Sequence, residues 1–194
     1  MMRSALITLL CLLGLAFPVM ADQKDTVENL LKEKTEAVLK VIQEKNVDEQ
    51  GYKNQIMDIV GPIIDFKLMA KLTLGKTNWG KLNKSQQKEF VDLFVARLEK
   101  LYSERSSMYC CVKIDYKPAF VRGNKIYAPI LVETNDKPLE MLYKFYSSSD
   151  GWKVYDVEIN GLSLVKSYQA QFSEVLKTGT AEDLLTELKK TDVK

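Results

Sequence analysis

The chain has 194 residues, and its 28 basic side chains nearly balance its 26 acidic ones, which leaves a formal net charge of +2. Because the two signs are interspersed, the sequence offers no basic stripe for a nucleic acid. It also contains no histidine, the commonest general base and the commonest metal ligand. The composition therefore argues against metal-dependent or triad-type catalysis.

The first residues have the form of a secretory signal peptide. Arg3 precedes an apolar run from Ala5 to Phe17, and the small-residue site Val19-Met20-Ala21 follows it. The run is too short to span a bilayer, and no later stretch reaches the length that a transmembrane helix requires. We expect cleavage of residues 1–21, export, and a single domain over residues 22–194.

Two cysteines, Cys110 and Cys111, remain after removal of the signal peptide, which contains Cys11. Adjacent cysteines on an extended chain point to opposite sides, and a bond between them strains the intervening peptide. We favour two small buried apolar side chains over a redox pair.

Four amphipathic helices are predicted in the first half of the chain, because apolar residues recur at helical spacing between cap and turn residues. Asp65 is placed to cap the third helix, with Gly75 beyond its end and Trp79 in the loop that follows. Asn83 and Gln86 have the form of a capping box for the fourth. The predicted ranges are 24–45, 48–60 with Asp48 as its cap, 66–74, and 85–106.

After residue 107 the hydrophobic period becomes two, which is typical of strands. Turn residues at 122–124, 135–138 and 147–151 separate the runs. Asn160 and Gly161 end the last strand, and apolar spacing becomes helical again from 162. The sequence thus predicts an α+β fold, with several helices packed on a four-stranded antiparallel meander at residues 112–116, 126–132, 139–146 and 152–159, and a final helix from 180.

The strand at 126–132 is apolar on both faces. Antiparallel sheets usually leave one face to water. We therefore expect helices to cover one face, and protein or some other apolar material to cover the other. The two faces carry Ile126, Ala128, Ile130 and Val132 on one side and Tyr127, Pro129 and Leu131 on the other.

Three motifs occur in a defined order between Tyr52 and Leu188. They are Ile64-Asp65-Phe66-Lys67-Leu68-Met69-Ala70 with Leu74-Gly75 and Trp79, then the helix with Gln86, Phe90, Phe94, Leu98 and Tyr102, then the run from Trp152 to Phe172. Together they resemble the pattern of MlaC-like proteins, the periplasmic phospholipid-binding components of the Mla transport pathway. Ser167-Tyr168-Gln169 departs from the Asn-Tyr-Arg of many members, so a headgroup contact by that arginine is absent here.

The resemblance implies a curved four-stranded antiparallel sheet and helices enclosing a deep apolar pocket for acyl chains. It implies a periplasmic carrier that shuttles phospholipid between an outer-membrane lipoprotein complex and the MCE-domain protein of an inner-membrane ABC transporter. It further implies a protein that is not an enzyme and has no cofactor, with the bound phospholipid as cargo.

Such a carrier needs a preformed apolar pocket with few polar anchors. A diacyl lipid has about thirty methylenes, and at roughly 0.8 kcal/mol each their exposure to water costs on the order of 20 kcal/mol. Any single apolar residue at element spacing is more often ordinary core than a lipid contact. As a set, we expect the pocket to be lined by Phe66, Met69, Phe94, Leu98, Tyr127, Leu131, Tyr143, Phe145, Val157, Ile159, Val165, Tyr168 and Phe172.

Two other functions stay open. Asp156 beside an apolar cavity would suit a small α+β enzyme with a hydrophobic substrate, but a solvated or turn-stabilising role is favoured because no histidine or nucleophile elbow accompanies it. The other alternative is a lipid-free exported interaction module. Its docking surface for an acidic partner or anionic headgroups would be the lysines near Trp79, although a charged helix face is usually just solvated. These lysines are Lys67, Lys71, Lys76 and Lys81.

Overall fold

The computed structural model describes residues 17–43, 49–103, 112–134 and 137–191, so the predictions for residues 1–16, for Asp48 and for Cys110 and Cys111 fall outside it. The described helices are α1 (Phe17–Gln43), α2 (Glu49–Val60), α3 (Phe66–Lys81), α4 (Lys84–Ser103), α5 (Leu164–Thr178) and α6 (Ala181–Thr191). The described strands are β1 (Lys113–Tyr116), β2 (Phe120–Arg122), β3 (Lys125–Glu133), β4 (Leu139–Ser148), β5 (Gly151–Ile159) and β6 (Leu162–Ser163).

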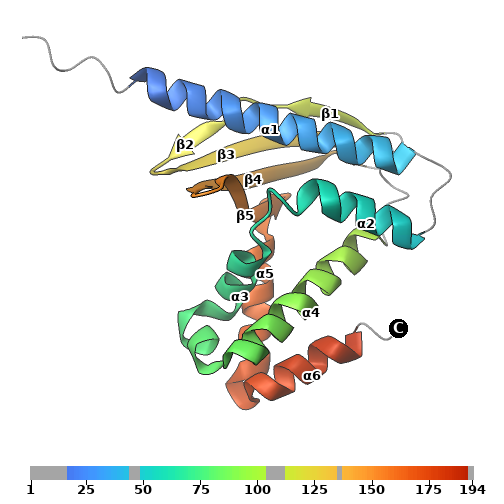
Figure 1. Ribbon diagram of the computed structural model, residues 1–194, viewed down its shortest axis with the longest axis vertical. Coiled ribbons are helices and arrows are strands. Elements are labelled where there is room, and N and C mark those ends of the chain that lie inside the picture. Colours follow the sequence, from blue (N-terminus) through green and yellow to red (C-terminus); the bar gives the residue numbers. More distant parts are fainter. Residues whose placement is uncertain (1–16, 44–48, 104–111, 135–136, 192–194) are drawn as a thin grey trace, which may run out of the picture.

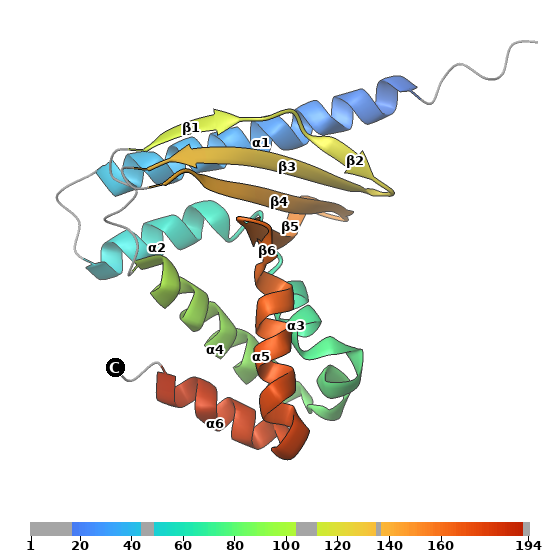
Figure 2. The same cartoon turned by 180° about the vertical axis from the view of Figure 1, so that it is seen from behind.

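The strands form one antiparallel sheet in the order β1-β3-β4-β5-β6, with β2 also paired to β3 (Figures 1 and 2). The α+β class and the antiparallel meander are confirmed. The expectation of four strands is wrong, because the described part of the sheet has six.

The two additional strands are short and depend on their neighbours. Beyond Pro118 the chain stays extended, and Gly123, at φ 62°, turns it back so that Phe120 pairs with Tyr127. Asn160 and Gly161 both have positive φ, 49° and 79°, which is the conformation of a two-residue hairpin turn. Leu162 therefore pairs with Ile159 before α5 begins.

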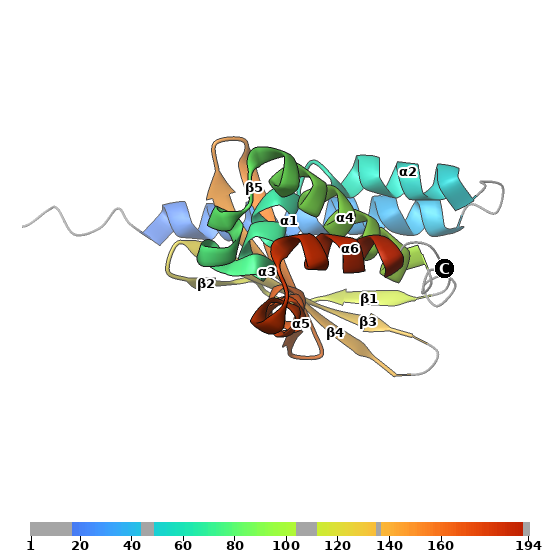
Figure 3. The ribbon, with the colours of Figure 1, turned by 90° about the horizontal axis from the view of Figure 1, so that it is seen from below.

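One face of the sheet, which we call the inner face, packs against α1. It carries Ile126, Ala128, Ile130 and Val132 of β3, each at most 3% exposed, together with the buried Phe145 and Val154. Val27 and Leu31 of α1 are buried in the same cluster. Figure 3 shows α1 and α2 on the same side of the sheet, so the expectation that helices cover one face is met.

A second core lies among α3, α4, α5 and α6, away from the sheet (Figure 2). Its centre is aromatic, with the Phe90 ring 5.6 Å from Phe172 and the Phe94 ring 5.4 Å from Tyr168, both edge to face. Trp79 packs on Phe90 in the same way at 6.5 Å. Both Trp79 and Leu82 are buried here, which ties the end of α3 to α4.

The predicted end of the third helix needs a correction. Gly75 does break it, at φ 71° and ψ 164°, but the chain becomes helical again as far as Lys81. Trp79 consequently lies in a helix and not in a loop. The pattern could not show this, because the second helical piece is stabilised by burial of Trp79 against α4 and not by a periodicity of its own.

On the opposite, outer face of the sheet, two cationic side chains lie over aromatic rings. The Arg122 guanidinium lies 5.2 Å from the ring centre of Phe120 and 5.3 Å from that of Tyr127. The Lys125 ammonium lies 4.4 Å from the ring centre of Tyr155. Burial and a hydrogen bond with Tyr127 raise the pKa of Tyr155. The second apolar face thus receives part of its cover from the chain's own cations.

Candidate functional site

A pocket of about 290 Å³ lies between the inner face of the sheet and the helices α1, α2, α3 and α4. Its volume is at the lower end of small-molecule sites, which run from about 300 to 1,000 Å³. The walls come from Leu31, Val38, Leu39, Ile42, Ile56, Met57, Val60, Ile63, Ile64, Phe66, Met69, Leu98, Leu101, Val112, Ile114, Ile130, Val132, Met141, Tyr143, Val154, Val157, Ile159 and Leu164, with the polar residues Lys34, Thr35, Tyr52, Lys53 and Glu99.

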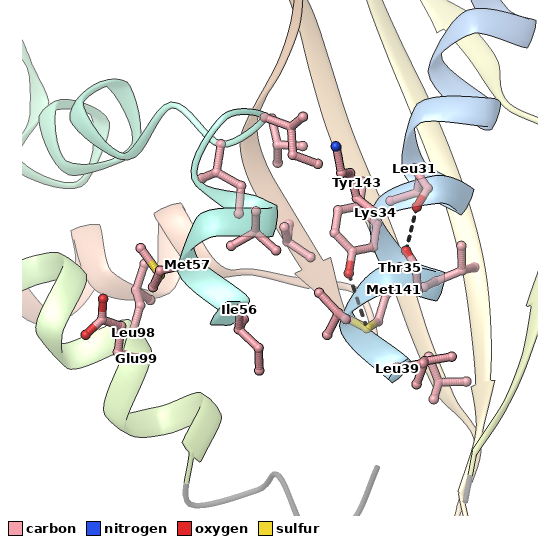
Figure 4. Close-up of a pocket in the computed structure, with 18 of the residues that line it drawn as sticks. Leu31, Lys34, Thr35, Leu39, Ile56, Met57, Leu98, Glu99, Met141 and Tyr143 are labelled. Carbon is pink, nitrogen blue, oxygen red and sulfur yellow. Dashed lines mark hydrogen bonds between the residues drawn. The ribbon is translucent and has the colours of Figure 1, made fainter. Parts of the chain in front are cut away.

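Figure 4 shows how the walls face one another. Leu31 and Leu39 of α1 stand on the same side as Met141 and Tyr143 of the sheet, and Ile56, Met57 and Leu98 stand across from them. Such a lining offers dispersion contacts and almost no polar groups to a ligand. The occupant that fits it is an extended apolar chain or another hydrophobic group.

The few polar residues of the lining come mainly from α1 and α2. Lys34 and Thr35 are neighbours on α1, Tyr52 and Lys53 are neighbours on α2, and Glu99 is on α4. The Thr35 hydroxyl donates to the Leu31 carbonyl at 2.7 Å, so it is already satisfied within its own helix. The charged groups in the lining, as far as the structure describes it, are thus two ammonium groups and one carboxylate.

Asp65 fixes the wall that α3 contributes. Its Oδ1 accepts from the Leu68 amide at 2.8 Å and caps the helix, and its own amide donates to the Val154 carbonyl at 2.9 Å. The Tyr146 hydroxyl donates to the other carboxylate oxygen, and this bond raises the pKa of Tyr146 to about 12. Phe66, the first residue of α3, is therefore held at the pocket by strand β5.

Asp156 fixes the start of α5 in the same way as Asp65 fixes the start of α3. Its carboxylate accepts from the Ser163 hydroxyl at 2.7 Å, from the Val165 amide at 3.1 Å and from the Lys144 ammonium at 2.8 Å. Glu158 is a second partner of Lys144. Burial acts to lower the pKa of Lys144, but the hydrogen bonds and charges of these two carboxylates outweigh it and raise the pKa.

These contacts decide how Asp156 is interpreted. The residue is 4% exposed, so it is not solvated, and it does not line the pocket. Its oxygens stabilise the turn and the start of α5, which is the structural role that the sequence favoured.

No group of three candidate metal ligands occurs among the described residues. None of the described helices has the length and apolar character needed to cross a membrane.

The structure brings six of the predicted site residues together in the pocket. They are Phe66, Met69, Leu98, Tyr143, Val157 and Ile159. The other seven lie elsewhere. Phe94, Val165, Tyr168 and Phe172 pack in the helical core, Phe145 is buried in the core between the sheet and α1, and Tyr127 and Leu131 lie on the outer face of the sheet. For all thirteen residues, contact with a ligand stays a prediction.

Sequence reasoning missed the α1 and α2 walls. The apolar stripe of α1 was visible in Val38 and Ile42, but it was assigned to packing against the domain. A stripe that packs and a stripe that lines a void have the same period, so no signal in the sequence distinguishes them. The lysines Lys67, Lys71, Lys76 and Lys81 are exposed, and their use for docking stays a prediction.

Comparison with known proteins agrees with this geometry. The chain is similar to the solved structure of a phospholipid-binding protein from Ralstonia solanacearum in complex with a phospholipid. The TM-score is 0.78 at 25% sequence identity, and the match covers 85% of this chain and 96% of that one. The model of the family described as MlaC protein matches residues 32–190, which run from α1 into α6. The chain therefore belongs to the MlaC family.

Proposed function

We propose that this protein is a periplasmic carrier that holds the acyl chains of a phospholipid in the pocket between the sheet and α1, α2, α3 and α4. The observation that carries the proposal is the apolar void itself, about 290 Å³, which stays open in a domain that also has two hydrophobic cores of buried residues. Family membership and the phospholipid in the similar Ralstonia solanacearum structure support the same ligand class.

The energetics favour a carrier of this kind. Each methylene moved from water to an apolar wall gains about 0.8 kcal/mol, so burial of most of thirty methylenes, at roughly 20 kcal/mol, outweighs the loss of freedom on binding, which costs about 4–15 kcal/mol. The ionisable side chains of the described lining are two lysines, two tyrosines and one glutamate, of which only Tyr52 and Lys53 share a helix. In the carrier that we propose, the lipid is bound and released without chemical change.

The direct test is organic extraction and mass spectrometry of protein purified from the periplasmic fraction. We expect phospholipid at a fixed ratio to protein. An intact-mass spectrum of the same protein should give Asp22 as the first residue, as the predicted cleavage requires. Protein that never carries lipid, from any preparation, would refute the proposal.

A variant that fills the pocket sharpens this test. Val38 is half-buried on α1 and lines the pocket, so Val38→Trp places an indole in the volume that we assign to an acyl chain. We expect at least a fivefold loss of bound phospholipid. Val175→Trp is the matched control, since Val175 is also a half-buried helical residue but packs against the second core. The control should retain lipid.

The partners implied by the family remain part of the proposal. The carrier would exchange phospholipid with the MCE-domain protein of an inner-membrane ABC transporter and with an outer-membrane lipoprotein complex. Transfer of a labelled phospholipid from loaded protein to the purified MCE-domain protein measures this step. Val38→Trp should fail in the assay for lack of cargo, whereas Val175→Trp should transfer normally.

A further inference from the structure

Cations and aromatic rings form a cluster on the outer face of the sheet, beside the turn that joins β2 to β3 (Figures 1 and 2). Arg122 and Lys125 are direct partners across this hairpin, so their side chains leave the sheet on the same face. Phe120 and Tyr127, the next pair on that face, stack with their ring centres 5.5 Å apart. The Arg122 guanidinium lies over both rings. These four side chains form one unit, which we call the hairpin cluster.

The two cations of the hairpin cluster lie opposite each other without a carboxylate to compensate them. Like charges directly opposite in an antiparallel pair destabilise it. Within the described ranges, the side chains of Arg122 and Lys125 contact aromatic rings, and no ion pair joins either one to a carboxylate. The acidic side chains of β5, Asp156 and Glu158, both bind Lys144 instead. The hairpin therefore carries two positive charges that an outside anion could neutralise.

The arginine of the cluster is held ready for such an anion. Contact with two rings limits the conformations of its side chain, and its N–H donors have no acceptor among the described residues. Arg122 is exposed, and Phe120 beside it is 36% exposed, one of three exposed large apolar side chains in the described part of the chain. A guanidinium fixed in this way can bind a carboxylate through two hydrogen bonds with little further loss of freedom.

The composition of the cluster indicates which kind of partner fits it. Arginine and aromatic residues are enriched at protein–protein interfaces and supply many of their hot spots. Attraction to an anionic lipid surface is non-directional and typically needs about four to eight cations, whereas the hairpin cluster has two. A protein that places carboxylates against both cations would gain directed hydrogen bonds and would cover the exposed ring of Phe120.

We propose that the hairpin cluster is a docking surface for an acidic protein, in which Arg122 binds one partner carboxylate and Lys125 binds a second. The cluster is on the outer face, whereas the lipid pocket lies between the inner face and the helices. A partner can therefore hold the carrier at the hairpin without occupying the pocket. This inference rests on the proposed function, because the acidic protein is one of the two lipid-exchange partners proposed above.

The test measures docking and lipid content separately. The double variant Arg122→Met and Lys125→Met removes both charges and keeps unbranched apolar side chains beside the rings. Loaded wild type and variant are bound to the immobilised MCE-domain protein and, separately, to the immobilised outer-membrane lipoprotein complex at about 0.15 M salt. We expect about tenfold weaker binding of the variant to at least one of them, which corresponds to about 1.4 kcal/mol. Extraction and mass spectrometry should find the same phospholipid content in both proteins.

The matched control removes two cations that already have carboxylate partners. Lys113→Met with Lys117→Met makes the same change in net charge on the same sheet, where Lys113 pairs with Glu133 and Lys117 with Asp115. This control should bind both partners as the wild type does. Unchanged affinity of the Arg122 and Lys125 double variant for both partners, or an equal loss in the control, would overturn the docking site.

Two further arms keep the result decisive. If the double variant does not fold, Arg122→Gln keeps a polar side chain at this exposed position and carries the same test, with an expected loss of about threefold. Vesicles of phosphatidylglycerol and phosphatidylethanolamine should bind the wild type no better than the double variant. Vesicle binding that requires the two cations, with partner binding unchanged, would assign the hairpin to a lipid surface and overturn the inference. Absence of lipid from the wild type would refute the proposed function, whereas lipid-loaded protein that docks equally well without the two cations refutes the docking site alone.

Discussion

Replacing Lys144 by methionine breaks a buried ion pair and keeps an unbranched side chain that is one atom shorter. The Lys144 side chain is 10% exposed and that of Asp156 is 6% exposed, with 2.8 Å between nitrogen and oxygen. The variant leaves Asp156 charged and buried, with the Ser163 hydroxyl and the Val165 amide as donors. Removing one partner of a buried pair costs about 3–5 kcal/mol. Because two donors remain, we expect the lower end, about 3 kcal/mol.

Urea unfolding of lipid-free protein measures this loss, and thermal unfolding should show a fall in Tm of about 6–12 °C. Lys88→Met is the matched control, since Lys88 pairs with Asp92 at 2.6 Å but the two side chains are 79% and 60% exposed. We expect about 0.5 kcal/mol or less there. If the two variants lose equal stability, or if Lys144→Met loses less than about 1 kcal/mol, then burial does not increase the contribution of this ion pair to stability.

The pair also predicts a dependence on pH. Its carboxylate partners raise the pKa of Lys144 above the ordinary value of 10.5. A raised pKa in the folded state stabilises the protein fully below the unfolded value and less as pH rises through the folded value. The stability difference between wild type and Lys144→Met should therefore stay constant from neutral pH up to about pH 10 and shrink above it. A difference that grows at alkaline pH would contradict this assignment.

Two further predictions concern the break in α3 and its N-terminal cap. Gly75→Ala should lower the free energy of unfolding by about 1–2 kcal/mol, because φ 71° with ψ 164° disfavours any side chain. Gly80→Ala in the same helix is the control: no atom lies within 4 Å of the added carbon, so urea unfolding should show an unchanged or higher stability. Equal effects would show that the break at Gly75 is not conformational. Tyr146→Phe should cost about 1 kcal/mol through loss of the bond to Asp65. The bond stabilises the folded state only while the Tyr146 hydroxyl is protonated, so this cost should disappear as pH rises from 10 towards the raised pKa of about 12. A cost that does not change with pH would argue against the bond.

Capping and turn preferences of neighbouring residues were sufficient to predict most helix ends and strand turns. Asp65 caps α3 as its position predicted, and Asn83 and Gln86 form their reciprocal bonds at 2.9 and 3.0 Å. Asn160 and Gly161 make the predicted turn between the last long strand and α5. These features depend on contacts within a few residues of the chain, so the sequence contains the information for them.

Other features depend on partners that are distant in the chain. Strand β2 has only three residues, and it forms because it pairs with Tyr127 and its neighbours on β3. The second part of α3 is helical because the Trp79 ring packs on Phe90 of α4. Six predicted pocket residues converge, but Phe94 and Phe172 have the same helical spacing and pack in a solid core. Apolar spacing indicates that a residue is buried, but it does not show whether protein or a ligand packs against that residue.

The sequence by itself determined the α+β class, most turn and cap positions, and a strand that is apolar on both faces, because periodicity and turn chemistry act over a few residues. Only the tertiary structure decided where the void lies. The pocket exists because α1, α2 and α4 approach the inner face of the sheet without closing on it, and the packing of elements far apart in the chain sets that separation.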